Sequence, residues 1–138
     1  MLRKEKILAI EDDANYRVIL HFMLDKFFVI DEAATLKEGT QKLALSCMNA
    51  EPYFCVLLDL GLPDSHSSKT FAAVLHAARA MPIVVISGFG DPQAVASTLA
   101  AGAADYLVKG KDDQNRAEMH ERIVEAVRAR ARPADAPN

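Results

Sequence analysis

Charged and hydroxyl side chains stand directly after four short apolar runs of the 138-residue sequence. They are Glu11 and Asp12 after residues 7–10, Asp59 after 55–58, Ser87 after 83–86 and Lys109 after 106–108. Carboxylates that gather in one place repel one another, and a divalent cation relieves this repulsion; an oxygen-rich site of this kind suits Mg²⁺. A lysine and a small hydroxyl beside such an ion could neutralise phosphate oxygens, and one carboxylate could then act as a nucleophile.

Each of these residues has a simpler explanation when it is taken alone. The acids at 11–13 could only favour the start of a helix, and Asp59 could be a turn residue. Ser87 could belong to a plain loop, and Lys109 could be a solvated charge. Their joint occurrence at the ends of four predicted strands favours a shared pocket, because open parallel sheets bind ligands beyond the carboxyl ends of their strands.

The elements that would position these residues alternate along the chain. Short apolar runs indicate strands at residues 7–10, 28–30, 55–58, 83–86 and 106–108. Apolar positions at helical spacing follow four of these runs: Tyr16, Ile19, Leu20, Met23, Leu24 and Phe27; then Leu36, Thr40, Leu43, Ala44 and Cys47; then Phe71, Val74, Leu75 and Ala78; and last Met119, Ile123, Ala126 and Val127. Thr35 with Glu38 indicates a capping box, and Asp91 with Pro92 indicates the start of the remaining helix. Because the strand runs are continuous rather than alternating, the pattern predicts an α/β fold in which helices cover both faces of a parallel sheet.

Composition bounds the class of protein. The length fits one domain, and 51% apolar residues provide a hydrophobic core and exclude a disordered chain. The net charge of −3 gives no basic field for direct nucleic-acid binding. Cys47 and Cys55 make no disulfide framework and are expected to be buried small hydrophobes. No run approaches the roughly 20 apolar residues that span a bilayer, and no signal peptide is evident, so we expect a cytoplasmic protein without membrane contact.

Four sequence motifs, in this order, resemble those of the receiver domain of two-component response regulators. They are ILAIEDD at 7–13, LLDLGLPD at 57–64, VVISG at 84–88 and GAADYLVKG at 102–110. The resemblance covers residues 6–130 and implies a flavodoxin-like (βα)5 fold, with five parallel strands in the order 2-1-3-4-5 flanked by five helices. We expect the receiver domain to occupy residues 1–131 and a flexible C-terminal tail to occupy residues 132–138.

The resemblance implies a metal site and a phosphoacceptor. Asp59 is similar to the family's phosphoacceptor, which also contacts the metal ion. Asp12 matches a direct Mg²⁺ ligand, and Glu11 matches the acid that holds the ion through water. The backbone carbonyl of Gly61 would complete the protein ligands. Asp13 falls one position later and is expected to start the first helix.

The resemblance also implies a phosphate-binding part and a switch. Ser87 matches the switch hydroxyl, the small Gly88 leaves room for the phosphodonor, and Lys109 matches the lysine that pairs with the phosphoryl group. Tyr106 matches the switch aromatic, which would move from outside to inside on phosphorylation. The chain departs from the family at Gly110, where a proline in a cis bond is usual, so the turn after Lys109 is expected to be freer.

The implied function is a phosphorylated switch rather than an enzyme with its own substrate. A sensor histidine kinase or a histidine phosphotransfer protein would donate the phosphoryl group to Asp59 with Mg²⁺ bound. The surface of the fourth helix, fifth strand and fifth helix would then change through Ser87 and Tyr106 and would act on an output domain or protein that the sequence does not identify. A homodimer is compatible with this function, although residues 94–101 carry no charge for a charged dimer interface.

Two other functions compete with the switch as explanations of these motifs. The first is a phosphorylation-independent interaction module of the same fold. The second is a hydrolase that forms an aspartyl phosphate on a related sheet. The hydrolase is disfavoured, because such enzymes have a second Asp two residues after the nucleophile, where this chain has Gly61.

Overall fold

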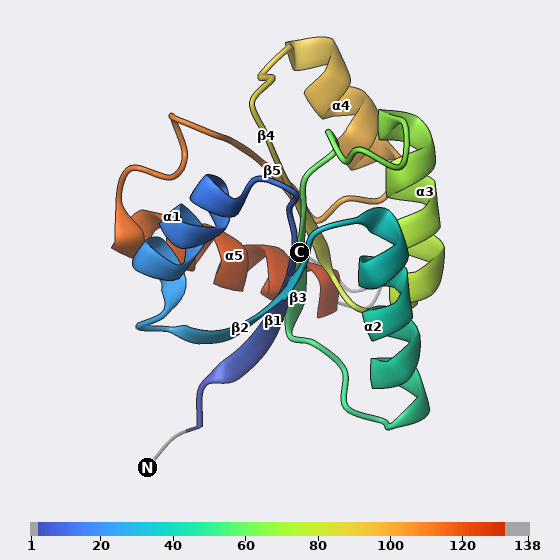
Figure 1. Cartoon of the computed structure of the whole chain (residues 1–138). Coiled ribbons are helices and arrows are strands. Elements are labelled where there is room, and N and C mark those ends of the chain that lie inside the picture. The colour runs from blue at the N-terminus through green and yellow to red at the C-terminus, as the bar shows by residue number, and fades with distance from the viewer. Residues whose placement is uncertain (1–2, 132–138) are drawn as a thin grey trace, which may run out of the picture.

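Five strands and five helices alternate along residues 3–131, the part of the chain that the computed structural model describes (Figure 1). The strands are β1 (Glu5–Ile10), β2 (Phe28–Ala33), β3 (Cys55–Leu58), β4 (Ile83–Ser87) and β5 (Asp105–Val108). The helices are α1 (Ala14–Leu24), α2 (Leu36–Met48), α3 (Ser67–Ala78), α4 (Pro92–Ala100) and α5 (Arg116–Ala131). The tail expected at 132–138 lies outside the described residues.

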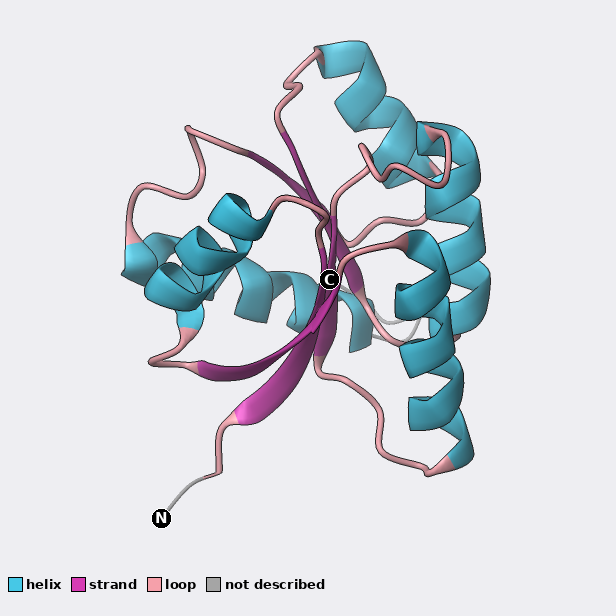
Figure 2. Cartoon of the chain, viewed as in Figure 1, coloured by secondary structure: helices cyan, strands magenta, loops and turns pink. Residues whose placement is uncertain are grey.

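The strands form one parallel sheet in the order β2-β1-β3-β4-β5, which confirms the predicted fold class. Helices α1 and α5 cover one face, and α2, α3 and α4 lie on the other (Figures 1 and 2). The chain begins in an inner strand, adds β2 on one side and then adds β3 to β5 on the other. The strand order therefore changes direction next to β1, and ligand sites of open α/β sheets lie at such a point.

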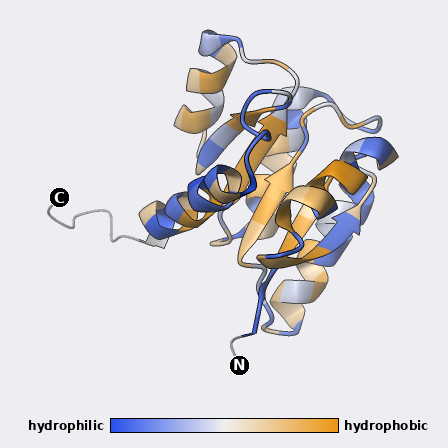
Figure 3. Ribbon diagram, turned by 90° about the vertical axis from the view of Figure 1, so that its left-hand side faces the viewer, coloured by the Kyte–Doolittle hydropathy of each residue, from blue (hydrophilic) through white to orange (hydrophobic). Residues whose placement is uncertain are grey.

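The core is divided by the sheet into two layers, and β1 contributes to both. Ile7 and Ala9 pack with α1 and α5, whereas Leu8 and Ile10 pack with α2 and α3. This alternation is the two-residue period of a strand, and both faces are apolar because both are covered by helices. Figure 3 shows the central strands in the hydrophobic colour, while the helices mix hydrophobic and hydrophilic residues.

Helix starts agree with the capping residues of the sequence. The hydroxyl of Thr35 accepts from the amide of Glu38 (3.1 Å), and the carboxylate of Asp91 accepts from the amide of Ala94 (3.3 Å). Asp13 is the N-cap of α1, as expected. These contacts satisfy amides that have no partner inside their own helices.

The predicted face of the first helix is partly wrong. Helix α1 ends at Leu24, so Phe27 lies beyond it in a turn, where its amide donates to the carbonyl of Leu24 at 2.9 Å. Ile19 is 43% exposed rather than buried. The core stripe of α1 is therefore narrower than its apolar sequence, with Tyr16, Leu20, Met23 and Leu24 buried.

The second helix is rotated relative to its predicted face. Its buried residues are Gly39, Leu43 and Ser46, while Cys47 is exposed, contrary to expectation. The cause is a close approach at Gly39, where an added Cβ would lie 2.6 Å from Cδ1 of Ile10. The glycine lets the backbone of α2 approach β1, and this contact decides which side of the helix faces the core.

Strand β2 extends to Ala33, past the predicted run at 28–30. It pairs only with β1 and is therefore an edge strand, which tolerates the polar residues Asp31 and Glu32. Of the helices between residues 3 and 131, none combines the length and the apolar character needed to cross a membrane.

Candidate functional site

The strand ladder itself holds the site residues at one edge of the sheet. Beyond β3, the amide of Asp59 donates to the carbonyl of Ile10 in β1 at 3.0 Å. Beyond β5, the amide of Lys109 donates to the carbonyl of Ser87 in β4 at 2.8 Å. Beyond β1, the amide of Glu11 donates to the carbonyl of Ala33, the last residue of β2, at 2.9 Å. Residues as far apart in the sequence as Glu11 and Lys109 thus meet because their strands are in register.

Three carboxylates gather at this edge. Glu11, Asp12 and Asp59 each offer an oxygen, and these oxygens lie within 4.8 Å of one another. Glu11 and Asp59 are buried, with 1% and 6% of their surface exposed, whereas Asp12 is exposed. The cluster therefore has a dry side that faces the sheet and a wet side through which an ion or a phosphodonor could enter.

Lys109 supplies the positive charge of the site. Its Nζ lies 2.6 Å from Oε1 of Glu11 and 3.7 Å from Oδ2 of Asp59. Oε1 of Glu11 has no further hydrogen-bond partner among the described residues. Burial, together with the neighbouring Asp59, raises the pKa of Glu11 to about 7, although Lys109 opposes this shift. The three carboxylates of the site therefore carry more negative charge than Lys109 alone can neutralise.

The residues present fit a hard divalent cation. Carboxylate oxygens are the donors that Mg²⁺ prefers, and the three carboxylates here face one lysine, so Oε1 of buried Glu11 has room for a second cationic partner or its hydration shell. Asp12 and Asp59 would supply direct ligands from the open side. An ion here would also relieve the repulsion among the three carboxylates.

The loop after Asp59 is held at both ends. The amide of Gly61 donates to Oδ1 of Asp59 at 3.0 Å. Further along, the carboxylate of Asp64 accepts from the amides of Leu36 and Lys37 at 2.9 and 3.1 Å. These backbone bonds lower the pKa of Asp64. Asp64 therefore caps α2 and fixes the β3–α3 loop next to the site.

Ser87 and Tyr106 contact the same residue from two sides. The hydroxyl oxygen of Ser87 accepts from the amide of Phe89 at 3.2 Å, and the hydroxyl of Tyr106 donates to the carbonyl of Phe89 at 2.9 Å. Tyr106 is only 5% exposed, so its ring already lies inside, where an outward position had been expected before phosphorylation. Gly88 is exposed, and a Cβ there would meet no described atom within 4 Å.

A cavity of about 530 Å³ lies beside Asp59. Ser87, Phe89 and Tyr106 line it, together with residues of α3 and α4. Within the described part of the chain, helix α4 contributes no buried residue to the core. One of the two helices that line this cavity is therefore weakly packed, which is the property expected of a part that moves.

The sequence profile of the response regulator receiver domain matches residues 7–124 of this chain. The chain belongs to this family. Among its relatives, the transcriptional regulatory protein FixJ of Bradyrhizobium diazoefficiens is 27% identical over 124 residues, which cover 90% of this chain and 58% of FixJ. The DNA-binding response regulator MtrA of Mycobacterium tuberculosis is 31% identical over 134 residues, which cover 96% of this chain and 53% of MtrA. The chain spans little more than half the length of these two relatives.

Solved structures of receiver domains share the fold. One is a CheY-like receiver domain protein from Methanospirillum hungatei, with a TM-score of 0.73 at 22% identity over 93% of this chain and 97% of that one. Another is a response regulator from Burkholderia pseudomallei with a phosphorylated aspartic acid, a calcium ion and citrate; its TM-score is 0.71 at 18% identity, over 93% of this chain and 72% of that one. At these identities the likeness shows the fold alone.

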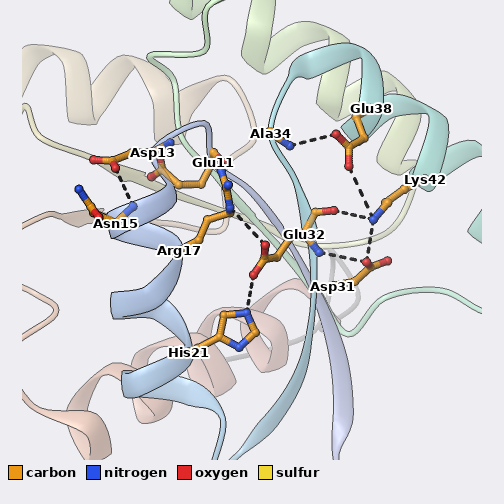
Figure 4. Close-up of polar contacts among 10 residues, drawn as sticks. All are labelled: Glu11, Asp13, Asn15, Arg17, His21, Asp31, Glu32, Ala34, Glu38 and Lys42. Carbon is orange, nitrogen blue, oxygen red and sulfur yellow. Dashed lines mark hydrogen bonds and ion pairs between the residues drawn. The ribbon is translucent and has the colours of Figure 1, made fainter.

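Arg17 contacts the backbone of the acidic loop, and no sequence pattern pointed to this contact. Its Nη1 donates to the backbone carbonyl of Glu11 at 2.8 Å, and its Nε lies 3.2 Å from Glu32 in β2 (Figure 4). Glu32 in turn contacts His21 at 2.5 Å. Arg17 thus clamps the backbone of the acidic loop to the edge strand, a contact that depends on how α1 lies against β2.

The turn after Lys109 is built without proline. Among the described residues no peptide bond is cis, and Gly110 has a φ of +83°, which glycine adopts without strain. The amide of Gly110 donates to Oδ1 of Asp113 at 2.9 Å, and Oδ2 of Asp113 accepts from the hydroxyl of Tyr16 at 2.6 Å. Tyr16 was expected only on the core face of a helix, and Asp113 was not expected at all. Their contact spans 97 positions, so no local pattern reveals it.

Proposed function

We propose that this chain is a phosphorylated switch in which Asp59 accepts a phosphoryl group. The observation that carries the proposal is the convergence of Asp59 with Glu11, Asp12 and Lys109 at one edge of the sheet. Family membership supports it, since receiver domains are phosphoacceptors in two-component signalling. Asp59 lies within reach of both the acids and the lysine, with Oδ2 at 3.7 Å from Nζ of Lys109.

The proposed metal ligands are Asp12, Asp59 and the carbonyl of Gly61, with Glu11 acting through water. When bound, Mg²⁺ supplies positive charge that stabilises the oxygens of a transferring phosphoryl group. The protein contributes the oxygen ligands. Glu11, which is only 1% exposed, forms the inner side of the site, away from water. Lys109, whose Nζ lies 3.7 Å from Oδ2 of Asp59, would pair with a phosphoryl oxygen.

In the proposed transfer, a carboxylate oxygen of Asp59 attacks the phosphorus of a phosphohistidine. An O–P bond forms, the P–N bond breaks, and its electron pair returns to the ring nitrogen of the donor histidine. Gly61 orients the acceptor, because its amide holds Oδ1 of Asp59 at 3.0 Å. The donor is a sensor histidine kinase or a histidine phosphotransfer protein. Reversal or hydrolysis of the same bond would reset the switch, and no other substrate is turned over.

The proposed switch passes through Phe89. On phosphorylation the hydroxyl of Ser87 would turn to a phosphoryl oxygen and would release the amide of Phe89, which it now holds at 3.2 Å. Tyr106 holds the carbonyl of the same residue at 2.9 Å, so a shift of Phe89 reaches Tyr106 directly. The surface of α4, β5 and α5 would then change shape and act on an output domain or protein.

The relatives leave the output open, since the chain spans 58% of FixJ and 53% of MtrA. Direct nucleic-acid binding by this domain is not proposed, because its net charge is −3. A cytoplasmic location, which is typical of response regulators, belongs to the proposal. A homodimer through the α4, β5 and α5 surface is compatible with it.

Treatment with acetyl phosphate and Mg²⁺, followed by intact-mass measurement, tests this function. The wild-type chain should gain the mass of one phosphoryl group and lose it again over time. Asp59→Asn should gain none, while Glu51→Gln, which changes an exposed carboxylate before β3 and away from the site, should behave like wild type. A wild-type chain that gains no phosphoryl group would support the phosphorylation-independent interaction module instead.

A further inference from the structure

We propose that Tyr16 is a positioning residue for Lys109: its hydroxyl holds the β5–α5 turn through Asp113, and its ring lies under the Lys109 ammonium. The proposal rests on the proposed function, because it assigns to α1 a part in phosphoryl transfer. Tyr16 lies in the first turn of α1, four residues after Asp12, and is 6% exposed.

The first observation is the pair that Tyr16 makes with Asp113. The hydroxyl of Tyr16 donates to Oδ2 of Asp113 at 2.6 Å, and both residues are buried, each at 6% exposure. Burial and the adjacent carboxylate raise the pKa of Tyr16 far above its ordinary value, so the hydroxyl stays protonated as a donor. Burial alone would raise the pKa of Asp113, but the bonds from Tyr16, Gln114 and the Gly110 amide lower it. Asp113 is therefore a fully ionised acceptor held by three donors.

The second observation is what the other oxygen of Asp113 does. Oδ1 accepts from the amide of Gly110 at 2.9 Å and from the side-chain amide of Gln114, also at 2.9 Å. Gly110 directly follows Lys109 and has a φ of +83°, a region in which glycine has much freedom. One carboxylate thus joins α1 to the backbone of the turn that carries the lysine. This turn is where other receiver domains have proline, and here a hydrogen-bonded clamp restrains it.

The third observation concerns the lysine itself. Nζ of Lys109 lies 4.4 Å from the centre of the Tyr16 ring, within the range of a cation–π contact. The same Nζ lies 2.6 Å from Glu11 and 3.7 Å from Asp59. The ring therefore closes one side of the ammonium and directs it toward the acids. Its hydroxyl and its ring act on Lys109 by two separate routes, through the backbone and through the side chain.

The chain offers a matched control for this contact. Tyr53 also donates its hydroxyl to a carboxylate, Oδ2 of Asp31, at 2.6 Å, and it is 7% exposed. Tyr53 precedes β3, at the opposite end of that strand from Asp59. Tyr53→Phe removes the same kind of bond from a similarly buried site without touching the turn after Lys109. An effect of Tyr16→Phe that is only structural should therefore be reproduced by Tyr53→Phe.

The test compares Tyr16→Phe with Tyr53→Phe in the full chain by two measurements. The first is the rate of phosphorylation by acetyl phosphate together with its dependence on Mg²⁺ concentration. We expect Tyr16→Phe to lower the maximal rate about tenfold, as misplacement of a catalytic group does, and to leave half-saturation by Mg²⁺ within about twofold, because no ligand is changed. Tyr53→Phe should stay within about twofold of wild type in both quantities.

The second measurement needs no phosphorylation. Hydrogen exchange at the amide of Gly110 should become about tenfold faster in Tyr16→Phe and should not change in Tyr53→Phe. Equal rates and equal Gly110 exchange in the two variants would overturn the proposal. Failure of the wild-type chain to accept a phosphoryl group would refute the proposed function instead, and the Gly110 exchange would still decide whether Tyr16 holds the turn.

Discussion

The ammonium of Lys109 lies 2.6 Å from Glu11 but 3.7 Å from Asp59, so its nearer anionic partner is the buried acid rather than the proposed phosphoacceptor. Glu11 is 1% exposed and would be costly to ionise without this partner. In the proposed cycle Lys109 must shift its contact toward a phosphoryl oxygen, while the metal ion takes over part of the neutralisation of Glu11.

This relationship predicts opposite effects of two substitutions on Mg²⁺ affinity. Lys109→Ala removes a positive charge that competes with the ion, so Mg²⁺ should bind about fivefold more tightly at alkaline pH. Glu11→Gln removes a negative charge from the cluster, so Mg²⁺ should bind at least about fivefold more weakly. Mg²⁺ titration followed by thermal unfolding measures both, since a ligand stabilises the state that binds it.

Lys111→Ala is the matched control, because it removes an exposed lysine two residues further along the same turn. It should leave Mg²⁺ affinity unchanged within about twofold, because exposed charges are screened. Weaker Mg²⁺ binding in Lys109→Ala would show that the lysine does not compete with the ion.

Restoring the proline that is usual in the family should harm this chain. Proline cannot adopt the φ of +83° at Gly110, and it would remove the amide that donates to Asp113 at 2.9 Å. Gly110→Pro should lower the free energy of unfolding by about 3 kcal/mol and slow phosphorylation. Gly110→Ala keeps the amide and should cost only about 1 kcal/mol for its left-handed φ. Urea unfolding gives both values, and a stabilised Gly110→Pro would contradict the described turn.

Much of the fold and of the site was predictable from local patterns. Continuous apolar runs indicated the strands, and the residues that follow four of the five runs, Asp59 and Lys109 among them, indicated the members of the site. The structure confirms the strand order, which the resemblance to receiver domains implied, and brings three of the predicted acids within 4.8 Å of one another. These features were accessible because each strand ends locally and the ends of parallel strands share one edge.

The features that were missed depend on contacts between distant segments. The rotation of α2 follows from the approach of Gly39 to Ile10, and the bond of Tyr16 to Asp113 spans 97 positions. Apolar spacing predicted Cys47 on the core side, because spacing alone does not say which side of a helix approaches the sheet most closely. The inward position of Tyr106 likewise depends on its bond to the carbonyl of Phe89.

The approach of α2 to β1 predicts a stability effect at Gly39. A Cβ there would lie 2.6 Å from Cδ1 and 2.9 Å from Cγ1 of Ile10, so either the helix or the isoleucine must move. Gly39→Ala should lower the free energy of unfolding by about 1–3 kcal/mol, although alanine favours helices. Gly88→Ala is the control, since a Cβ there meets no described atom within 4 Å, and it should be neutral or slightly stabilising. A neutral Gly39→Ala would show that the two elements are not tightly packed.

The ion pairs of His21 with Asp25 and Glu32 should make the stability of the protein depend slightly on pH. Burial alone would lower its pKa, but the bonds with Asp25 and Glu32 outweigh burial and hold the pKa above its ordinary value of 6.5. A raised pKa in the folded state means that the stabilisation is complete below 6.5 and is lost as the pH rises through the folded value. Because the His21 side chain is 35% exposed, the loss should be less than about 1 kcal/mol.

Unfolding free energies of wild type and His21→Gln across this pH range measure the effect. The difference between the two proteins should be largest at acidic pH and should shrink as His21 loses its proton. His76→Gln, which changes an exposed histidine of α3, should follow wild type throughout. A difference that grows toward alkaline pH would contradict the ion pairs of His21.

Chemical location of the acyl phosphate tests most directly whether Asp59 is the phosphoacceptor. After treatment with acetyl phosphate and Mg²⁺, borohydride reduction converts a phosphorylated aspartate to homoserine, which peptide mass spectrometry places in the sequence. We expect homoserine at position 59 and aspartate at position 12. Homoserine at Asp12, or an unmodified Asp59 in a chain that has gained a phosphoryl group, would contradict it.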